Sequence, residues 1–116
     1  MRWHDRDGVS VLVLEGRFDA AVATRVAEWL DATDERPSAD AIVDLGAVTF
    51  IDSTALATLV KGLRRCRQLN GDLVLCGLQK AVSIIFEVTR LNQAFAIYQT
   101  EDAAFASLRF ESQRSR

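Results

Sequence analysis

The residues with the clearest chemical potential are a carboxylate and two hydroxyls that are adjacent in the sequence. Asp52, Ser53 and Thr54 come shortly before a strongly amphipathic segment that begins at Leu56. They therefore lie at the start of a helix, where free backbone N–H groups donate hydrogen bonds to a capping side chain or stabilise an added negative charge. Two interpretations stay open: Asp52 or Ser53 caps the helix, or Ser53, with Thr54 as a second candidate, is a phosphorylated hydroxyl.

The composition argues against the common kinds of catalytic, metal and nucleotide-binding site. The single histidine, His4, lies near the start of the chain, which argues against a Ser-His-Asp triad or a multi-histidine metal site. The two cysteines, Cys66 and Cys76, are too far apart for a C-x-x-C motif and too few for a disulfide framework, so we expect reduced thiols. The sequence also lacks a G-x-x-x-x-G-K-[ST] phosphate loop. We therefore expect no enzyme activity, no catalytic residue, no metal and no cofactor.

Strand and helix patterns alternate along the chain after a tight turn at Asp7-Gly8. The β-branched and apolar runs predict strands at residues 2–5, 9–14, 41–45, 73–76 and 95–98. Apolar residues at helical spacing predict helices at 20–32, from Leu56 to a stop at Asn70-Gly71, around 82–86, and after Thr100. A loop that contains Pro37 connects the first helix to the next strand.

This alternation predicts an α/β fold with a mixed, mostly parallel sheet, an antiparallel edge hairpin at the N-terminus and about four helices. Residues 1–110 would form one domain and residues 111–116 a flexible tail. In a parallel sheet the strand-to-helix connections lie at the carboxyl ends of the strands. We therefore expect Asp19, Ser53, Gln79-Lys80 and Thr100 to gather on one rim. Asp19 would cap the first helix, contact a partner or orient Ser53.

Length and charge narrow the class of protein. The 116 residues make one ordinary domain, and the formal net charge of -2 gives no electrostatic footprint for nucleic acid. No apolar run approaches the roughly 20 residues of a membrane span, and the polar first residues do not resemble a signal peptide. We expect a cytoplasmic protein, a monomer or weak dimer, that neither binds nucleic acid nor inserts into a membrane.

The chain resembles the STAS domain family, and in particular the bacterial anti-sigma factor antagonists, over nearly its whole length. The segment from Phe50 to Leu56, FIDSTAL, is similar to the family signature Asp-Ser-[Ser/Thr]-Gly-Leu, and it follows a strand that ends with Val43-Asp44-Leu45. Gly16-Arg17-Phe18-Asp19 resembles the Gly-x-Leu-Asp motif before the first helix. The segment from Asn70 to Leu75 resembles the turn into the next strand.

This resemblance implies a STAS-like fold and a partner-switching function. In the family, an anti-sigma factor that is also a serine kinase phosphorylates the serine after the signature aspartate, and a PP2C-type phosphatase removes the phosphate. Carried over, Ser53 is the phosphorylated residue. The unmodified protein would bind the anti-sigma factor and so release a sigma factor, whereas the phosphorylated protein would not. The implied partner-binding residues are Asp19, Asp52, Ser53, Thr54 and Ala55.

Two positions depart from the family pattern. Ala55 stands where the family usually has glycine, which would place a methyl group beside the acceptor hydroxyl where a partner approaches most closely. Val22 stands where a polar residue often follows the aspartate of the first motif. These departures leave an alternative open: a STAS module that binds through the same rim without a switch. Such a module would be a scaffold or accessory subunit of a stress-signalling complex or a phospholipid transport system.

The acidic residues after the first long strand and the basic residues of the predicted second helix bear on two further functions. A phosphoaspartate receiver would need an acidic pair after the first long strand to hold a metal. Only the separated Glu15 and Asp19 are available there, which argues against a receiver domain.

The predicted second helix carries a basic run that is either a solvated face or a docking stripe for an acidic partner. Its members are Lys61, Arg64, Arg65 and Arg67.

Overall fold

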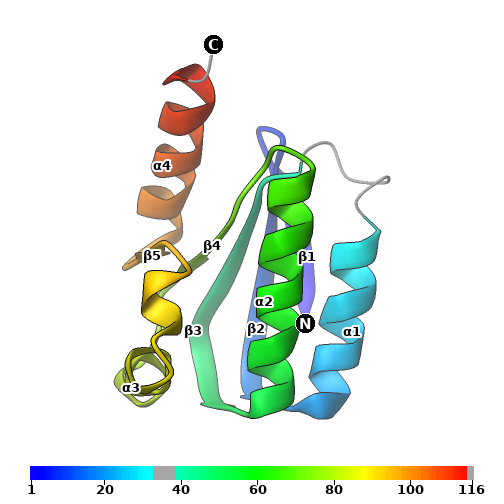
Figure 1. Ribbon diagram of the computed structural model, residues 1–116, viewed down its shortest axis with the longest axis vertical. Helices are drawn as coiled ribbons and strands as arrows, with labels where there is room; N and C mark the ends of the chain where they lie inside the picture. The colour runs from blue at the N-terminus through cyan, green and yellow to red at the C-terminus, as the bar shows by residue number, and fades with distance from the viewer. Residues whose placement is uncertain (33–38, 115–116) are drawn as a thin grey trace.

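A single five-stranded sheet forms the centre of the molecule, with strand order β1-β2-β3-β4-β5 (Figure 1). The computed structural model describes residues 1–32 and 39–114, with side chains through residue 109. β1 pairs with β2 in antiparallel fashion, and every later neighbour is parallel. The strands are β1 (Arg2–Arg6), β2 (Val9–Phe18), β3 (Ala41–Ile51), β4 (Leu73–Cys76) and β5 (Ile97–Tyr98). The predicted fold class, a mostly parallel α/β sheet with an antiparallel edge hairpin, is confirmed.

The helices cover both faces of this sheet. α1, α2 and α3 pack on one face, while α4 packs on the other. In Figure 1, α2 runs along the front of the sheet, and α4 extends upward from the end of β5. The helices are α1 (Ala20–Asp31), α2 (Ser53–Gln68), α3 (Lys80–Val88) and α4 (Glu101–Arg114), with a 3-10 turn η2 (Leu91–Gln93) before β5. The predicted loop around Pro37 lies outside the described residues.

Alternation along the central strands creates two separate apolar cores. In β2, Leu12 faces the α1–α3 side and its neighbour Val11 faces the α4 side, as the period of two in a strand requires. The larger core lies between the sheet and the three helices, and it includes Phe18, Leu59 and Phe86. The smaller core lies under α4 and consists of Val9, Val11, Ile42, Val74, Cys76, Ala104 and Leu108.

β2 and β3 are longer than the sequence predicted. Gly16 was expected to end the first long strand, but the strand continues to Phe18 because the β2–β3 pairing shifts register on either side of it. Gly16 has a φ of 74°, the left-handed conformation that glycine adopts without steric cost, and so it absorbs one of these bulges. β3 likewise runs to Ile51 instead of ending near Leu45. β5 starts later than predicted because Phe95 is buried in the core after the 3-10 turn.

The extra length of β3 staggers the carboxyl ends of the strands. β3 pairs with β2 as far as Ile51, but with β4 only as far as Asp44. At roughly 3.3 Å per residue, the end of β3 lies on the order of 20 Å beyond the end of β4. The expectation that Asp19, Ser53, Gln79-Lys80 and Thr100 share one rim was therefore wrong for Gln79-Lys80, which follow β4, and for Thr100. It begins α4 on the opposite face of the sheet.

The last helix begins as predicted. Thr100 caps α4, because its Oγ1 accepts a hydrogen bond from the backbone N–H of Ala103 at 3.1 Å. The helical backbone continues to Arg114, four residues into the segment 111–116 that the sequence suggested as a flexible tail, so flexibility there stays a prediction. None of the helices in the described ranges has the length and apolar character needed to cross a membrane.

Candidate functional site

The candidate site lies where β2 and β3 end together. Phe18 and Ile51 are the last paired residues of the two strands. Immediately after them, the backbone N–H of Asp52 donates a hydrogen bond to the carbonyl oxygen of Phe18 at 3.2 Å. This bond joins the start of α2 to the chain just before α1. The ends of the strands therefore hold Asp19 and Asp52 next to each other, as the sequence predicted for this half of the rim.

Both aspartates cap the helix that follows them. The Oδ1 atom of Asp52 accepts a hydrogen bond from the N–H of Ala55 at 2.8 Å, and Asp19 Oδ1 accepts one from Val22 at 3.3 Å. Each aspartate has extended backbone geometry, which is typical of an N-cap residue. The sequence had left open whether Asp52 or Ser53 caps α2, and the structure assigns that role to Asp52.

Because Asp52 caps α2, the Ser53 side chain takes no part in capping. Ser53 is the first residue of the helix and is exposed, and its hydroxyl makes no hydrogen bond with the described residues. The hydroxyl of Thr54 is equally exposed and unpaired within the same ranges. Both oxygens thus lie at the positive end of the helix dipole, where an added negative charge is stabilised.

Contrary to the expectation from the sequence, the Ala55 methyl group does not lie where a partner would approach. Its side chain is fully buried in the larger core, and its N–H is occupied by Asp52. The methyl group therefore points inward rather than into the space where a partner would approach. A partner would meet the exposed hydroxyls of Ser53 and Thr54, while Ala55 offers no exposed surface of its own.

The structure adds one pair of residues beside this rim. The Arg17 guanidinium lies 4.0 Å from the centre of the Phe50 ring, across the paired ends of β2 and β3. Phe50 is 37% exposed, which is unusual for a large aromatic side chain in a strand. The sequence showed both residues only as parts of motifs, because their cross-strand pairing depends on the two register shifts in β2.

The remaining predicted residues do not join the rim directly. Gln79, which precedes α3, donates a hydrogen bond from Nε2 to the Gly46 carbonyl oxygen at 2.9 Å, and the exposed Lys80 begins that helix. The basic run of α2 is exposed, and Arg67 holds neighbouring loops through Asp72 at 3.4 Å and the Ala94 carbonyl at 3.3 Å. Its use as a docking stripe stays a prediction.

The two cysteines are buried, one in each core, and they form no disulfide with each other. Burial raises the pKa of Cys76 to about 12, and the nearby negative charge of Asp44 adds to the effect. The Cys76 thiol therefore stays protonated at neutral pH. Because the thiolate is the reactive form of cysteine, Cys76 is not a reactive nucleophile in the folded protein. Within the described residues, no cluster of three or more histidine, cysteine or acidic side chains has the arrangement of a metal site.

The model of the STAS domain family matches residues 2–104. The chain belongs to this family. Among curated STAS relatives, the anti-sigma-B factor antagonist of Listeria monocytogenes is 32% identical over 97 residues, which cover 84% of each protein.

Solved STAS structures share this fold with different functional descriptions. An anti-sigma factor antagonist from Mycobacterium paratuberculosis superposes with a TM-score of 0.80 at 27% identity, covering 93% of this chain and 92% of that one. A sulfate transporter family protein from Wolinella succinogenes gives a TM-score of 0.81 at 22% identity, covering 93% and 90%. The fold alone thus occurs in both regulatory and transport proteins.

Proposed function

We propose that this STAS domain is an anti-sigma factor antagonist that binds an anti-sigma factor when Ser53 is unmodified and loses that partner when Ser53 is phosphorylated. The observation that carries the proposal is the division of labour at the start of α2. Asp52 caps the helix, and this leaves the exposed Ser53 hydroxyl without a structural role. The similarity to the Listeria anti-sigma-B factor antagonist supports the choice of partner class.

The chemistry is supplied from outside the domain. A serine kinase, proposed to be the anti-sigma factor itself, would transfer the γ-phosphoryl group of ATP to Ser53. The Ser53 Oγ–phosphorus bond forms, the bond to the β-phosphate oxygen breaks, and ADP and the hydroxyl proton leave. A PP2C-type phosphatase would hydrolyse the phosphoserine. The domain itself would be a cytoplasmic binding protein and not an enzyme.

The switch would act by charge and not by refolding. A phosphate adds about 1.5 to 2 negative charges at neutral pH, and here it would join Asp19 and Asp52 on the same rim. The N-terminus of α2 tolerates this charge, so the helix has no reason to unfold. A partner surface that matches the unmodified rim would instead face a dense negative group, and each 1.4 kcal/mol of lost binding energy is about tenfold in affinity.

The test is a pull-down from extracts of the source cells with three proteins: wild type, Ser53→Ala and Ser53→Asp. We expect wild type and Ser53→Ala to recover the same ATPase-fold kinase, identified by mass spectrometry, and Ser53→Asp to recover at least tenfold less. Ala106→Asp is the control for added charge, because Ala106 is exposed on α4, on the other face of the sheet from this rim, and this variant should recover as much kinase as the wild type. Equal recovery by all variants would contradict the switch.

The Wolinella structure favours one alternative, because a sulfate transporter family protein has this fold. In that case the domain would bind its partner through the same rim without a phosphorylation switch, as a scaffold or accessory subunit in a stress-signalling complex or a phospholipid transport system. The same pull-down distinguishes the two functions. A partner other than a kinase, recovered equally by wild type and Ser53→Asp, would support the alternative.

A further inference from the structure

We propose that α4 covers the second face of the sheet and opens as a unit while the rest of the domain stays folded. The contacts of Arg6, which we call the Arg6 strap, hold α4 to the β1–β2 hairpin in the closed state. This device lies on the face opposite α2, and it is independent of the function proposed for Ser53. The proposal depends on three features of the structure: the Arg6 contacts, the small apolar anchor of α4, and the separation of the two cores.

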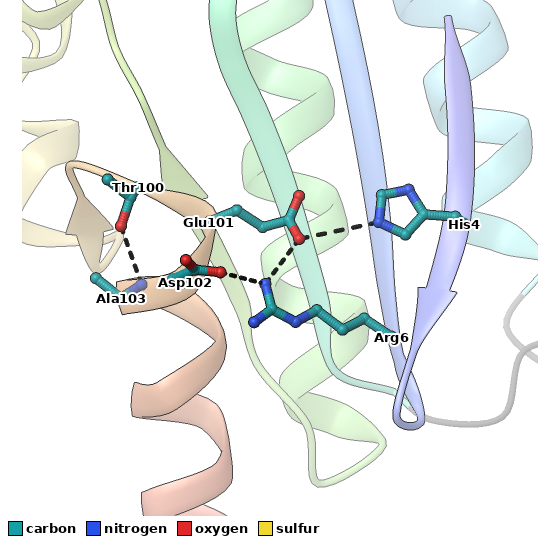
Figure 2. Close-up of polar contacts among 6 residues, drawn as sticks. All are labelled: His4, Arg6, Thr100, Glu101, Asp102 and Ala103. Carbon is teal, nitrogen blue, oxygen red and sulfur yellow. Dashed lines mark hydrogen bonds and ion pairs between the residues drawn. The ribbon is translucent and has the colours of Figure 1, made fainter.

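Arg6 reaches from β1 to the first turn of α4, as Figure 2 shows. Its Nη1 atom lies 2.8 Å from Glu101 Oε2 and 2.8 Å from Asp102 Oδ1, and its guanidinium lies 4.3 Å from the centre of the Phe105 ring. The hydrogen bonds that Arg6 donates to Glu101 and Asp102 raise the pKa of Arg6 above its ordinary value. One side chain therefore contacts three residues at the start of the helix, and His4 Nε2 approaches Glu101 from the same strand at 3.9 Å.

A second contact ties α4 to the same hairpin. Arg109 Nη1 lies 3.5 Å from the carbonyl oxygen of Asp7, which belongs to the turn between β1 and β2. The Arg109 guanidinium is also 5.7 Å from the Phe105 ring, so Phe105 is approached by a cation from each side of the interface. The long hydrogen bond and the exposure of Arg109 make this the weaker tie.

The apolar anchor of α4 is small compared with these polar ties. Through residue 109, only Ala104 and Leu108 are fully buried in the helix, and Phe105 is partly buried. The helix packs mainly on β3, β4 and β5, and the last of these is a strand of two residues that leads into the helix. Few buried apolar contacts and a short tether are features of segments that open locally, below the free energy of global unfolding.

The sheet itself separates the two cores. Lifting α4 would expose Val11, Ile42, Val74 and Cys76, all of which belong to the smaller core. The larger core under α1, α2 and α3 would keep its contacts, and with it the starts of α1 and α2. The domain would therefore present a new apolar face without disturbing Asp52 and Ser53. Opening should become easier when the charges of the strap are removed or screened by salt.

The two cysteine thiols report on the two cores separately. Cys76 is 1% exposed under α4, and Cys66 is fully buried under α2. The test measures the reaction rate with the thiol reagent 5,5′-dithiobis(2-nitrobenzoic acid) at pH 8 in two single-cysteine proteins, Cys66→Ala and Cys76→Ala. In each protein, Arg6→Met removes the charge but keeps an apolar side chain over Phe105. Arg2→Met is the matched control, because Arg2 lies on the same strand in an exposed pair with Glu15 at 3.5 Å.

We expect Arg6→Met to accelerate labelling of Cys76 at least tenfold and to leave labelling of Cys66 within twofold of the parent protein. Arg2→Met should change neither rate, and 0.5 M sodium chloride should accelerate Cys76 alone. Equal acceleration of both cysteines would mean global unfolding and would overturn the proposal, as would an unchanged Cys76 rate. If Arg6→Met does not fold, the double variant Glu101→Gln with Asp102→Asn removes the same charges from the helix side.

Discussion

At the scale of single residues, Asp52 and Ser53 are neighbours with separate roles. The Asp52 carboxylate satisfies the N–H of Ala55, whereas the Ser53 hydroxyl is exposed and unpaired within the described chain. Sequence alone could not separate them, because aspartate and serine are equally good N-cap residues. The choice depends on where β3 ends, since the residue just after the strand receives the N-cap geometry.

This division of roles predicts different stabilities for two alanine variants. Asp52→Ala should lower the free energy of unfolding by about 1 kcal/mol, because it leaves a helix N–H without its acceptor. Ser53→Ala should change it by less than about 0.5 kcal/mol, as expected for an exposed side chain without a partner. Urea denaturation of both variants measures the difference. Equal losses would contradict the assignment of Asp52 as the cap.

At the scale of elements, the sequence predicted the order of strands and helices correctly, but not the lengths of β2 and β3. A glycine in a strand pattern can end the strand or form a bulge, and only the partner strand decides which. Here Phe50 and Ile51 of β3 continue the pairing beyond Gly16, with Arg17 and Phe18 as their partners. The contacts of Arg6 with α4 could not be predicted from local sequence patterns either, because Arg6 and Glu101 are 95 residues apart.

The bulge at Gly16 leads to a prediction about β2. Because its φ of 74° is unfavourable for a residue with a Cβ atom, Gly16→Ala should lower the free energy of unfolding by about 1 to 2 kcal/mol. Apart from the two chain neighbours of Gly16, no atom of the described residues lies within 4 Å of the position of an added Cβ, so the variant would mainly measure backbone strain. Gly16→Asn should cost less than Gly16→Ala, since asparagine tolerates this conformation better. Chemical denaturation of both variants gives the ranking, and a stable Gly16→Ala would contradict the bulge geometry.

At the scale of the whole molecule, stability should fall at alkaline pH because of Cys76. Its pKa is raised from about 9 to about 12 in the folded state, so the folded protein holds this proton more tightly than the unfolded chain. The resulting stabilisation is complete below pH 9 and is lost as the pH rises from 9 towards 12. Between pH 9 and pH 11 we expect a loss of about 2 kcal/mol from this thiol.

The measurement is the free energy of unfolding by urea at several pH values between 8 and 11. Cys76→Ala is the control, because it lacks the titrating thiol but keeps the other groups that ionise in this range. Its stability should fall less steeply with pH than that of the wild type. Parallel curves for the two proteins would show that the Cys76 thiol does not cause the alkaline loss.

The hydrogen bond from Asp52 N to Phe18 O has a consequence for recognition by any partner. It fixes the spacing of the two helix starts before a partner arrives, so little conformational entropy remains to be lost on binding at this rim. Binding energy is then spent on contact and not on ordering the surface. On a pre-organised rim of this kind, the free energy of adding or removing one charge would change the affinity directly, without being offset by reordering of the surface. A small domain that switches partners by a single modification needs this property.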